Sequence, residues 1–357
     1  MPPPIAVRRT TDRPLTERAA TWLRARLGRA VVLAYVAALL VPRPGVWLGE
    51  PHPLPTAHLT LNMGPLLLCL VLFSAGLQVP PRALGHLVRR PRVLVAGLAL
   101  HLTIPLAVVP FVAHLLRYTP DSDGGSGLLT AMILTVAMPV AAGATVWTDK
   151  GDGDQSAMVG LVLLSTLASP LTTPFLLRTL TPLLSGGYPH ALAASDRVAQ
   201  GGFALTSVVL PCVVGLVGSL VLPARWHRRV LGTVVPAALA GSLALTYVNA
   251  SGALSSVLAR PRPLLIAASL GVAALICGLS FALGRIAARG LRLEAGMASS
   301  LTLACGMNNS SASAVLITTS LPGKPHLLLP VLAYGLLQKT AASRIVARSQ
   351  PVRALRP

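Results

Sequence analysis

The sequence has few acidic and few aromatic residues. Of its 357 residues only 10 are Asp or Glu, aromatic residues make up 4%, and charged residues of both signs make up 11%. A water-soluble domain of this length needs a much larger charged surface, so the composition excludes an ordinary soluble protein. The hydrophobic fraction of 53% indicates instead that a lipid bilayer solvates most of the surface.

Motifs of enzymes, metal sites and disulfide frameworks are also missing. The four cysteines lie inside apolar segments without CxxC or Cys/His spacing, so no zinc site or disulfide is predicted and buried thiols are expected. No GxSxG, HExxH or Walker sequence occurs, and no acid is paired with a base at membrane depth. The run Asp149, Asp152 and Asp154 lacks EF-hand spacing and favours a solvated turn. We therefore expect no enzyme, no cofactor and no metal site.

Basic residues are abundant, and 30 Lys and Arg give a formal net charge of +20. In a soluble protein this charge favours nucleic-acid binding, but no basic stripe alternates with aromatic residues here. The basic residues form short clusters between apolar runs, which is typical of the cytoplasmic connections of membrane proteins. The expected surroundings are therefore a lipid bilayer and not nucleic acid.

Apolar segments long enough to cross a bilayer recur along the whole chain. About 20 mostly apolar residues in a helix span the roughly 30 Å hydrocarbon layer. Ten such segments are predicted, at residues 29–48, 61–80, 93–116, 127–147, 157–178, 201–222, 230–249, 263–284, 296–319 and 326–345. The sequence thus predicts an all-α polytopic membrane protein with about ten transmembrane helices.

The distribution of charge predicts the orientation of these segments. With the N-terminus inside, the large majority of Lys and Arg fall in inner connections. Lys339 is counted with them, which leaves no cation within the membrane. This distribution predicts a multi-pass protein of the cell membrane with both termini in the cytoplasm. Residues 1–28 are predicted to be a basic disordered arm rather than a signal peptide, and residues 346–357 a basic cytoplasmic tail.

Ten segments divide into two halves of five, residues 29–180 and 200–345. An odd number of spans in each half places the second half upside down, as in transporters built from inverted repeats. Such repeats predict broken helices at corresponding positions, the fourth and the ninth. The fourth carries Pro139, Gly143 and Thr145 in mid-span, and the ninth carries the polar run Gly306 to Ser313. Both disruptions support two inverted five-helix repeats.

Polar residues at membrane depth are the candidate binding residues. Amides and hydroxyls in hydrocarbon need partners or a water-filled cavity, and the ninth segment places Asn308, Asn309 and Ser310 there, directly after Gly306 and Met307. They either line a substrate pathway or hold helices together.

Two further candidates lie in the first half. Pro139 either frees backbone carbonyls for a cation or polar substrate, or simply kinks its helix. His101, within the third span, relays a proton or lines the cavity, or else packs against its neighbours.

The sequence resembles the bile acid:sodium symporter family over most of the ten segments. The family pattern PGGTASNV…G…STLxSPLxTPL is matched in ungapped register at Pro139, Val146, Gly153, Ser165-Thr-Leu and Ser169-Pro170-Leu-Thr-Thr-Pro174. Gly306-Met307-Asn308-Asn309-Ser310 is similar to the family's E-x-G-M-Q-N-S-G. The LFSAGLQV sequence around Leu77, followed by Arg-Pro-Arg, resembles the second helix and its loop.

This resemblance implies two inverted repeats, a core domain with crossed and unwound fourth and ninth helices, and a panel of helices one, two, six and seven. It further implies that an organic anion, such as a bile acid, a steroid conjugate or a pantoate-like acid, binds near the crossing. Sodium drives transport in that family, and the core moves against the panel to give alternating access.

Most of the family's sodium ligands are replaced in this chain. The resemblance places its Ser-Asn pair at Ala144 and Thr145, its next Ser and Thr at Met158 and Val162, and its Glu at Ala304. Sodium needs several oxygen ligands and a carboxylate, so weakened or lost coupling is expected. The family's Gln in the third helix falls at or beside His101. Coupling to protons, exchange and passive transport are the alternatives.

The sequence therefore predicts a secondary transporter of a small organic anion. Two alternatives stay open. One is an arsenite or weak-acid efflux carrier, for which Cys305 beside the ninth-segment break offers a thiol. The other is a membrane sensor or structural partner that keeps the fold without transport.

Overall fold

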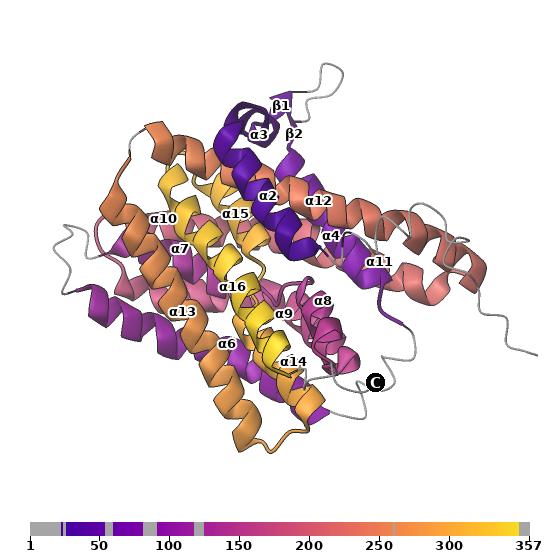
Figure 1. The fold of residues 1–357 in the computed structure, drawn as a ribbon. Coiled ribbons are helices and arrows are strands. Elements are labelled where there is room, and N and C mark those ends of the chain that lie inside the picture. Colours follow the sequence, from indigo (N-terminus) through magenta and orange to yellow (C-terminus); the bar gives the residue numbers. More distant parts are fainter. Residues whose placement is uncertain are drawn as a thin grey trace, which may run out of the picture.

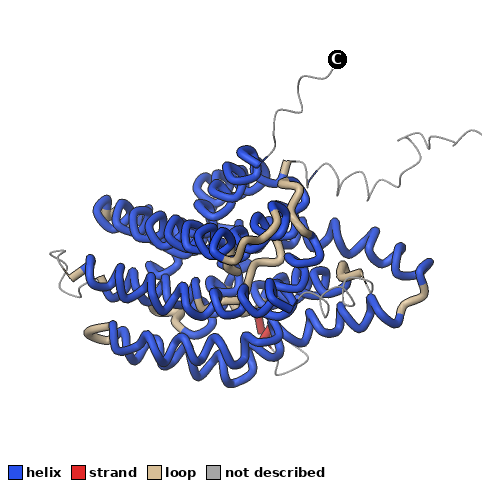
Figure 2. The backbone as a smooth tube through the Cα atoms, turned by 90° about the horizontal axis from the view of Figure 1, so that it is seen from below, coloured by secondary structure: helices blue, strands red, loops and turns tan. Residues whose placement is uncertain are grey.

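The computed structural model describes residue 23 and residues 26–53, 60–80, 91–117, 125–259 and 261–349. Helices dominate this part of the chain (Figure 1). The small exception is an antiparallel pair of strands, β1 (His52–Pro53) and β2 (Thr60–Leu61), which is visible in the view from below (Figure 2). The predicted basic arm and tail lie for the most part outside the described residues.

Helices occupy all of the predicted apolar segments, with two of these segments interrupted in the middle. In chain order the main helices are α2 (Leu27–Leu40), α3 (Pro42–Gly49), α4 (Met63–Leu77), α6 (Pro91–Leu116), α7 (Ser126–Val136), α8 (Ala144–Lys150), α9 (Gln155–Leu180), α10 (Tyr188–Val198), α11 (Leu210–Val221), α12 (Ala224–Ala259), α13 (Pro263–Gly290), α14 (Ala295–Gly306), α15 (Ser310–Ser320) and α16 (Leu328–Ser349). A π-helical stretch, Ala199–Val209, joins α10 to α11. Short 3₁₀ turns cover Thr181–Leu183 and Pro325–Leu327.

Several described helices are long and apolar enough to cross a membrane on their own. There are five, covering Pro91–Leu116, Gln155–Leu183, Gly202–Val221, Ala224–Ser255 and Pro263–Gly290. The pair α2 and α3, bent by 95°, makes a sixth if it is one span. The molecule is thus an all-α protein with several membrane-spanning helices, whereas the total of ten and the inverted repeat stay predictions.

Side-chain caps set the beginnings of two helices that line the cavity described below. Asn62 begins α4 by accepting a hydrogen bond from the Gly64 amide at 3.3 Å. Asp154 begins α9 in the same way, with its Oδ1 2.9 Å from the Ala157 amide nitrogen. These caps satisfy backbone donors that have no partner within the helix. The acidic turn predicted between the fourth and fifth segments therefore has a structural role at its last residue.

The helices pack as two groups. In the first group, α4 packs against α11 and α12, and α12 packs against α2 and α3. In the second group, α13 packs against α14 and α16, α6 packs against α9, and α15 packs against α16. Figure 1 shows α2, α4, α11 and α12 together on the upper right, beside the second group. The interface between the groups contains the cavity described below.

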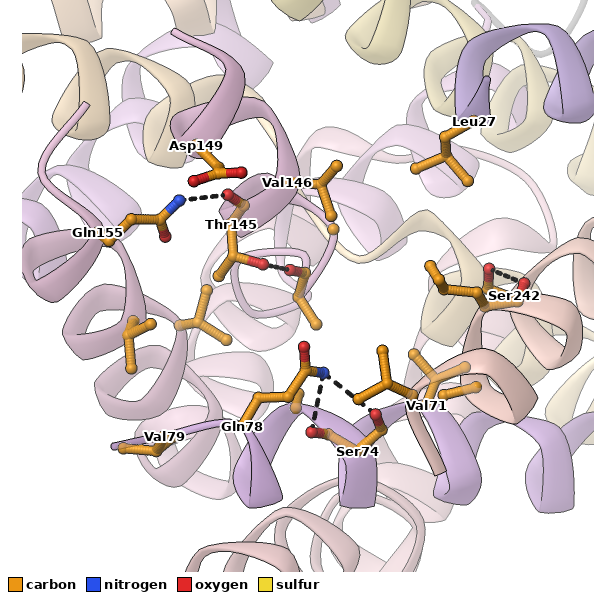
Figure 3. A pocket seen from close by; sticks show the side chains of 18 of the residues that line it. Leu27, Val71, Ser74, Gln78, Val79, Thr145, Val146, Asp149, Gln155 and Ser242 are labelled. Atoms are coloured by element: carbon orange, nitrogen blue, oxygen red, sulfur yellow. Dashed lines mark hydrogen bonds between the residues drawn. The ribbon is translucent and has the colours of Figure 1, made fainter. Parts of the chain in front are cut away.

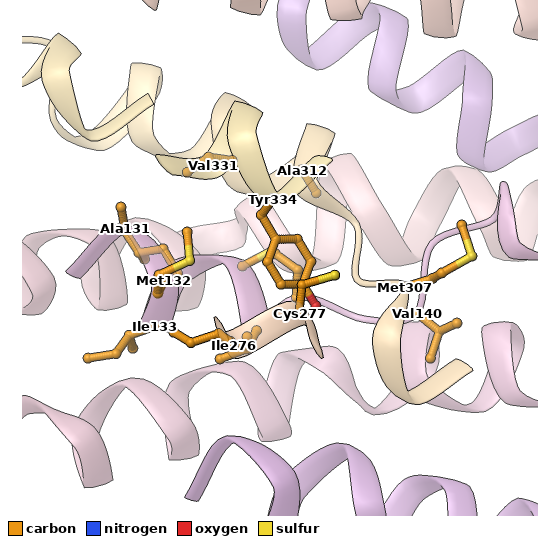
Figure 4. Close-up of a cluster of buried hydrophobic side chains, with 14 of the residues drawn as sticks. Ala131, Met132, Ile133, Val140, Ile276, Cys277, Met307, Ala312, Val331 and Tyr334 are labelled. Atoms are coloured by element: carbon orange, nitrogen blue, oxygen red, sulfur yellow. The ribbon is translucent and has the colours of Figure 1, made fainter. Parts of the chain in front are cut away.

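The outer faces of the helices are apolar, and the interior is tightly filled. Leu171 is 80% exposed, Leu264 85% and Val221 74%, which indicates contact with lipid tails because water would oppose such surfaces. Every residue of α7 except Gly127 is buried. Figure 4 shows the center of this core, where Met132, Ile276 and Tyr334 meet beside the two interrupted segments.

Candidate functional site

Two interrupted helices meet at their breaks inside the second group. The helix of the fourth segment stops between α7 and α8, and that of the ninth stops between α14 and α15. Val140 and Asn308 face each other there as an isolated antiparallel bridge. The Ala141 amide donates to the Met307 carbonyl at 2.8 Å, and the Asn309 amide donates to the Pro139 carbonyl at 2.9 Å. The two breaks thus satisfy each other's backbone groups.

Hydroxyl side chains engage further carbonyls at the ends of the half-helices. Ser313 Oγ donates to the Leu134 carbonyl at 3.0 Å, and Thr173 Oγ1 donates to the Ala137 carbonyl at 2.8 Å. The Ser165 hydroxyl accepts a hydrogen bond from the Val140 amide at 3.1 Å. Each of these bonds stabilises the crossing, because an unpaired backbone group at this depth is costly.

Tyr334 of α16 closes the crossing from one side. Its hydroxyl donates to the Gly306 carbonyl at 3.1 Å and accepts from Asn308 Nδ2 at 3.0 Å. Gly306 itself lies against the ring of Phe281, so that a side chain at this position would collide with the ring. Figure 4 shows Tyr334 pointing from α16 toward the chain at Met307 and Val140.

The predicted polar residues of the ninth segment are therefore fixed by protein partners. Asn309 Oδ1 caps α15 by accepting from the Ala312 amide at 3.1 Å. Ser310 Oγ accepts from Gln338 Nε2 at 3.3 Å. Asn308 and Asn309 are both buried, with exposed fractions of 4% and 8%. These groups build the crossing, which was one of the two roles open to them.

A cavity of about 600 Å³ lies where the two helix groups meet. Its wall in the first group comes from α2, α4 and α12, with Val71, Gln78 and Ser242 among the lining residues. Its opposite wall comes from the break after α7, from α8 and from α9, with Thr145 and Gln155 among them. Figure 3 shows these side chains around a common opening. The volume suits a small organic solute.

Polar groups in the cavity wall are held by neighbouring backbone. Gln155 Nε2 donates to the Thr145 carbonyl at 2.9 Å, and Thr145 Oγ1 donates to the Ala142 carbonyl at 2.8 Å. Gln78 Nε2 donates to the carbonyl and hydroxyl oxygens of Ser74 at 3.0 and 3.1 Å. The two amides lie on opposite walls, so polar side chains face the cavity from both helix groups.

One end of the cavity carries one acidic and one basic residue, Asp149 and Lys150. Burial lowers the pKa of Lys150, and the Asp149 carboxylate acts in the opposite direction. The ammonium also lies over the Trp147 ring, 5.1 Å from its center. This pair gives the cavity a polar end next to a mostly uncharged wall.

Sequence comparison relates this architecture to known proteins. Residues 65–260, more than half of the chain, match the Sodium Bile acid symporter family. The chain belongs to this family. It is also similar to a protein of Bacillus subtilis (strain 168) described as "Uncharacterized sodium-dependent transporter YocS", with 22% identity over 266 residues, which cover 74% of each chain.

Membership of the sodium bile acid symporter family determines the general class of the protein. It is a membrane protein with several spans and a secondary transporter, not an enzyme, and its substrate is a small solute. The matched residues include the first interrupted helix and both walls of the cavity.

The structure separates the sequence-predicted site residues into three places. Thr145 lines the cavity. The crossing contains Pro139, Gly306, Met307, Asn308, Asn309 and Ser310. His101 lies in α6, is 6% exposed, and its Nε2 has no hydrogen-bond partner among the described residues. Backbone carbonyls around Pro139 accept hydrogen bonds from other segments, that of Pro139 from the Asn309 amide and that of Ala137 from Thr173.

Sequence reasoning missed the amides of Gln78 and Gln155 in the cavity wall. Gln155 lies outside the quoted motifs and Gln78 was cited only as part of the LFSAGLQV sequence. Only the packing of α4 opposite α8 and α9 brings the two side chains to one cavity. It also misplaced Lys339, which we had assigned to an inner connection. This residue lies near the middle of α16, beside buried Gln338. A cation is therefore present within the helix bundle, contrary to the prediction.

Proposed function

We propose that the protein transports a small organic anion across the cell membrane by alternating access. The observation that supports this proposal is the cavity of about 600 Å³ between the two helix groups, whose opposite walls belong to different groups. The first group corresponds to the panel that the family resemblance implies, and the second to its core. Movement at their interface would open the cavity to alternate sides.

The proposed architecture has ten spans in two inverted halves, residues 29–180 and 200–345, with both termini in the cytoplasm. Its support is the pairing of the two interrupted segments at Val140 and Asn308, one from each half. The excess of basic residues in alternate connections supports the orientation.

We propose further that sodium coupling is weak or absent, although the similar Bacillus subtilis protein is described as sodium-dependent. Four of the positions where the family resemblance expects side-chain ligands carry apolar residues, and these residues, Ala144, Met158, Val162 and Ala304, are all buried. These side chains offer no oxygen to a cation. Buried His101, whose Nε2 has no partner among the described residues, is then the candidate to carry a coupling proton.

Counterflow in proteoliposomes tests this function without a coupling gradient. Vesicles preloaded with unlabelled taurocholate or pantoate should accumulate the same labelled anion, equally in sodium and in choline medium. Thr145→Trp fills the cavity and should abolish counterflow. Thr103→Trp is the matched control, because Thr103 is exposed on α6 and bonds only within its own helix, so transport should continue.

Several results would contradict the proposal. If neither anion exchanged, or if Thr145→Trp left exchange unchanged, the cavity would not be the pathway of an anion carrier. Exchange only in sodium medium would restore a sodium symporter and refute the proposed loss of coupling.

The structure bears on the two alternative functions as well. An arsenite carrier would present a reactive thiol to its substrate. Cys305 is buried, with 9% exposed, and is not among the residues that line the cavity. A sensor without transport would have no need of a solute-sized cavity between two helix groups. Both observations favour the organic-anion carrier.

A further inference from the structure

Lys339 is a basic side chain within the helix bundle that the transport proposal has not yet used. It is half-buried near the middle of α16, and it has no hydrogen bond or ion pair in the part of the chain that the structure describes. The residue before it, Gln338, is 2% exposed and donates to Ser310 Oγ at 3.3 Å. Lys339 therefore follows directly on a residue that contacts the crossing, and the described residues give its ammonium no countercharge.

The contacts of other residues on the same face of α16 show which helices lie next to Lys339. Four residues earlier, a Cβ on Gly335 would lie 2.8 Å from Ser310 Oγ and 3.6 Å from Tyr35 Oη. Seven residues later, Val346 lies against Gly151 just after the end of α8. Residues spaced by four and seven share one face of a helix. Lys339 thus lies between the start of α15 and the end of α8.

This face is directed toward helices that line the cavity. α16 packs against both α8 and α12, one from each wall, and Tyr35 belongs to α2, which contributes to the first wall. Figure 1 shows α16 between α13 on one side and α2 and α8 on the other. Lys339 is not among the residues that line the cavity in this structure, but its face of α16 is directed toward α2 and α8, which contribute to the two walls.

An unpaired ammonium at this depth is unfavourable for folding. Charged side chains within membrane bundles are rare, and they usually pair with a carboxylate or backbone carbonyls when their role is structural. The described residues give Lys339 neither kind of partner. Its positive charge is available to a bound group from outside the chain.

We propose that Lys339 is a binding residue that pairs with the carboxylate or sulfonate of the transported anion. The inference rests on the proposed transport of an organic anion and names the group that recognises its charge. A fixed ammonium neutralises the anion by a charge-assisted hydrogen bond, so a bound sodium ion is not needed for this purpose. This accounts for apolar residues at the positions where the family resemblance expects sodium ligands.

Anion binding to purified full-length protein in detergent tests the proposal. Isothermal titration in choline chloride would compare pantoate, and taurocholate below its micellar concentration, with the neutral lactone of pantoate. Lys339→Gln should weaken binding of the anions by about tenfold or more, because a hydrogen bond to a charged group is lost. Lys339→Arg should retain affinity within about threefold, and binding of the lactone should not change.

Two controls separate binding from stability. Lys324→Gln removes a lysine in the connection between α15 and α16, where the ammonium lies over the Tyr188 ring, and it should leave anion affinity unchanged. Unliganded Lys339→Gln should melt at the same temperature as the parent or higher, because an unpaired charge is removed from the bundle. A structural lysine would give the opposite shift.

The outcomes distinguish this inference from the transport proposal. Unchanged anion affinity in Lys339→Gln would overturn the role of Lys339 and leave anion transport in place. If the parent protein bound neither anion, the proposed substrate class would fail, and this inference with it. If Lys339→Gln and Lys339→Met both melted well below the parent, the residue would be structural and the inference overturned.

Discussion

At the scale of single residues, the crossing depends on side chains that replace helical hydrogen bonds. Tyr334 is the largest of the fully buried side chains and bonds to both partners, the Gly306 carbonyl and the Asn308 amide. The hydroxyls of Ser313 and Thr173 likewise donate hydrogen bonds to backbone carbonyls at the C-terminal end of α7. A broken helix in a membrane persists only where such groups satisfy its free backbone.

Tyr334→Phe should destabilise the protein by about 1–3 kcal/mol, because it removes one hydroxyl and leaves two buried polar groups without that partner. The melting temperature in detergent, followed by a thiol-independent probe such as static light scattering, measures the effect. Tyr247→Phe is the control, since its hydroxyl donates to the Val41 carbonyl at a more exposed place and should matter less. Equal melting temperatures for Tyr334→Phe and the parent would show that the phenol does not hold the crossing.

At the scale of elements, small residues determine how closely helices approach in the first group. Gly76 of α4 lies against the backbone carbonyl of Cys212, and Gly215 of α11 lies against that of Phe73. The two glycines therefore form a reciprocal contact between α4 and α11. Close approach of this kind increases van der Waals packing, which drives helix association in membranes where no hydrophobic force acts between helices.

Gly76→Ala should lower stability by about 1–3 kcal/mol, since the added methyl group meets rigid backbone rather than a movable side chain. The melting temperature and the monodisperse fraction in size-exclusion chromatography measure the loss. Gly278→Ala in α13 is the matched control, because nothing lies within 4 Å of a Cβ there, and it should be neutral or slightly stabilising. If the two variants behaved alike, the close approach of α4 and α11 would not limit stability.

At the scale of the whole molecule, the proposed transport mechanism requires the two helix groups to move against each other. Val71 of α4 and Val146 of α8 lie on opposite walls of the cavity, whereas Val71 and Ser242 both lie on the first wall. Figure 3 shows the three residues around the same opening. A tether across the cavity therefore restrains the proposed movement, and a tether within one wall does not.

Cross-linking with a flexible bismaleimide tests this movement. In a Cys69→Ser background, the pair Val71→Cys with Val146→Cys should lose most counterflow after treatment, because the groups become tied together. The pair Val71→Cys with Ser242→Cys should keep it. The other three native cysteines are buried, so they should react little. Full transport after verified cross-linking across the cavity would refute movement of the two groups as the mechanism.

Much of the architecture was predictable from the sequence because it depends on local composition. Apolar length predicted the helices, and Pro139 and the run from Gly306 to Asn309 predicted where two of them are interrupted. The family was also recognisable from these motifs, since the residues of each motif lie close together in the chain. A bilayer makes such patterns informative, because every spanning segment must satisfy its backbone internally and present apolar side chains to lipid.

Only the tertiary structure decided how the interrupted segments satisfy one another and what lines the cavity. Val140 and Asn308 are far apart in the sequence, and their bridge uses backbone groups that no residue pattern reveals. Gln78 and Gln155 share a cavity because α4 packs opposite α8 and α9. Lysine is a residue type typical of inner connections, yet the structure places Lys339 near the middle of α16. Long-range contacts determine these features, and a linear pattern carries little record of them.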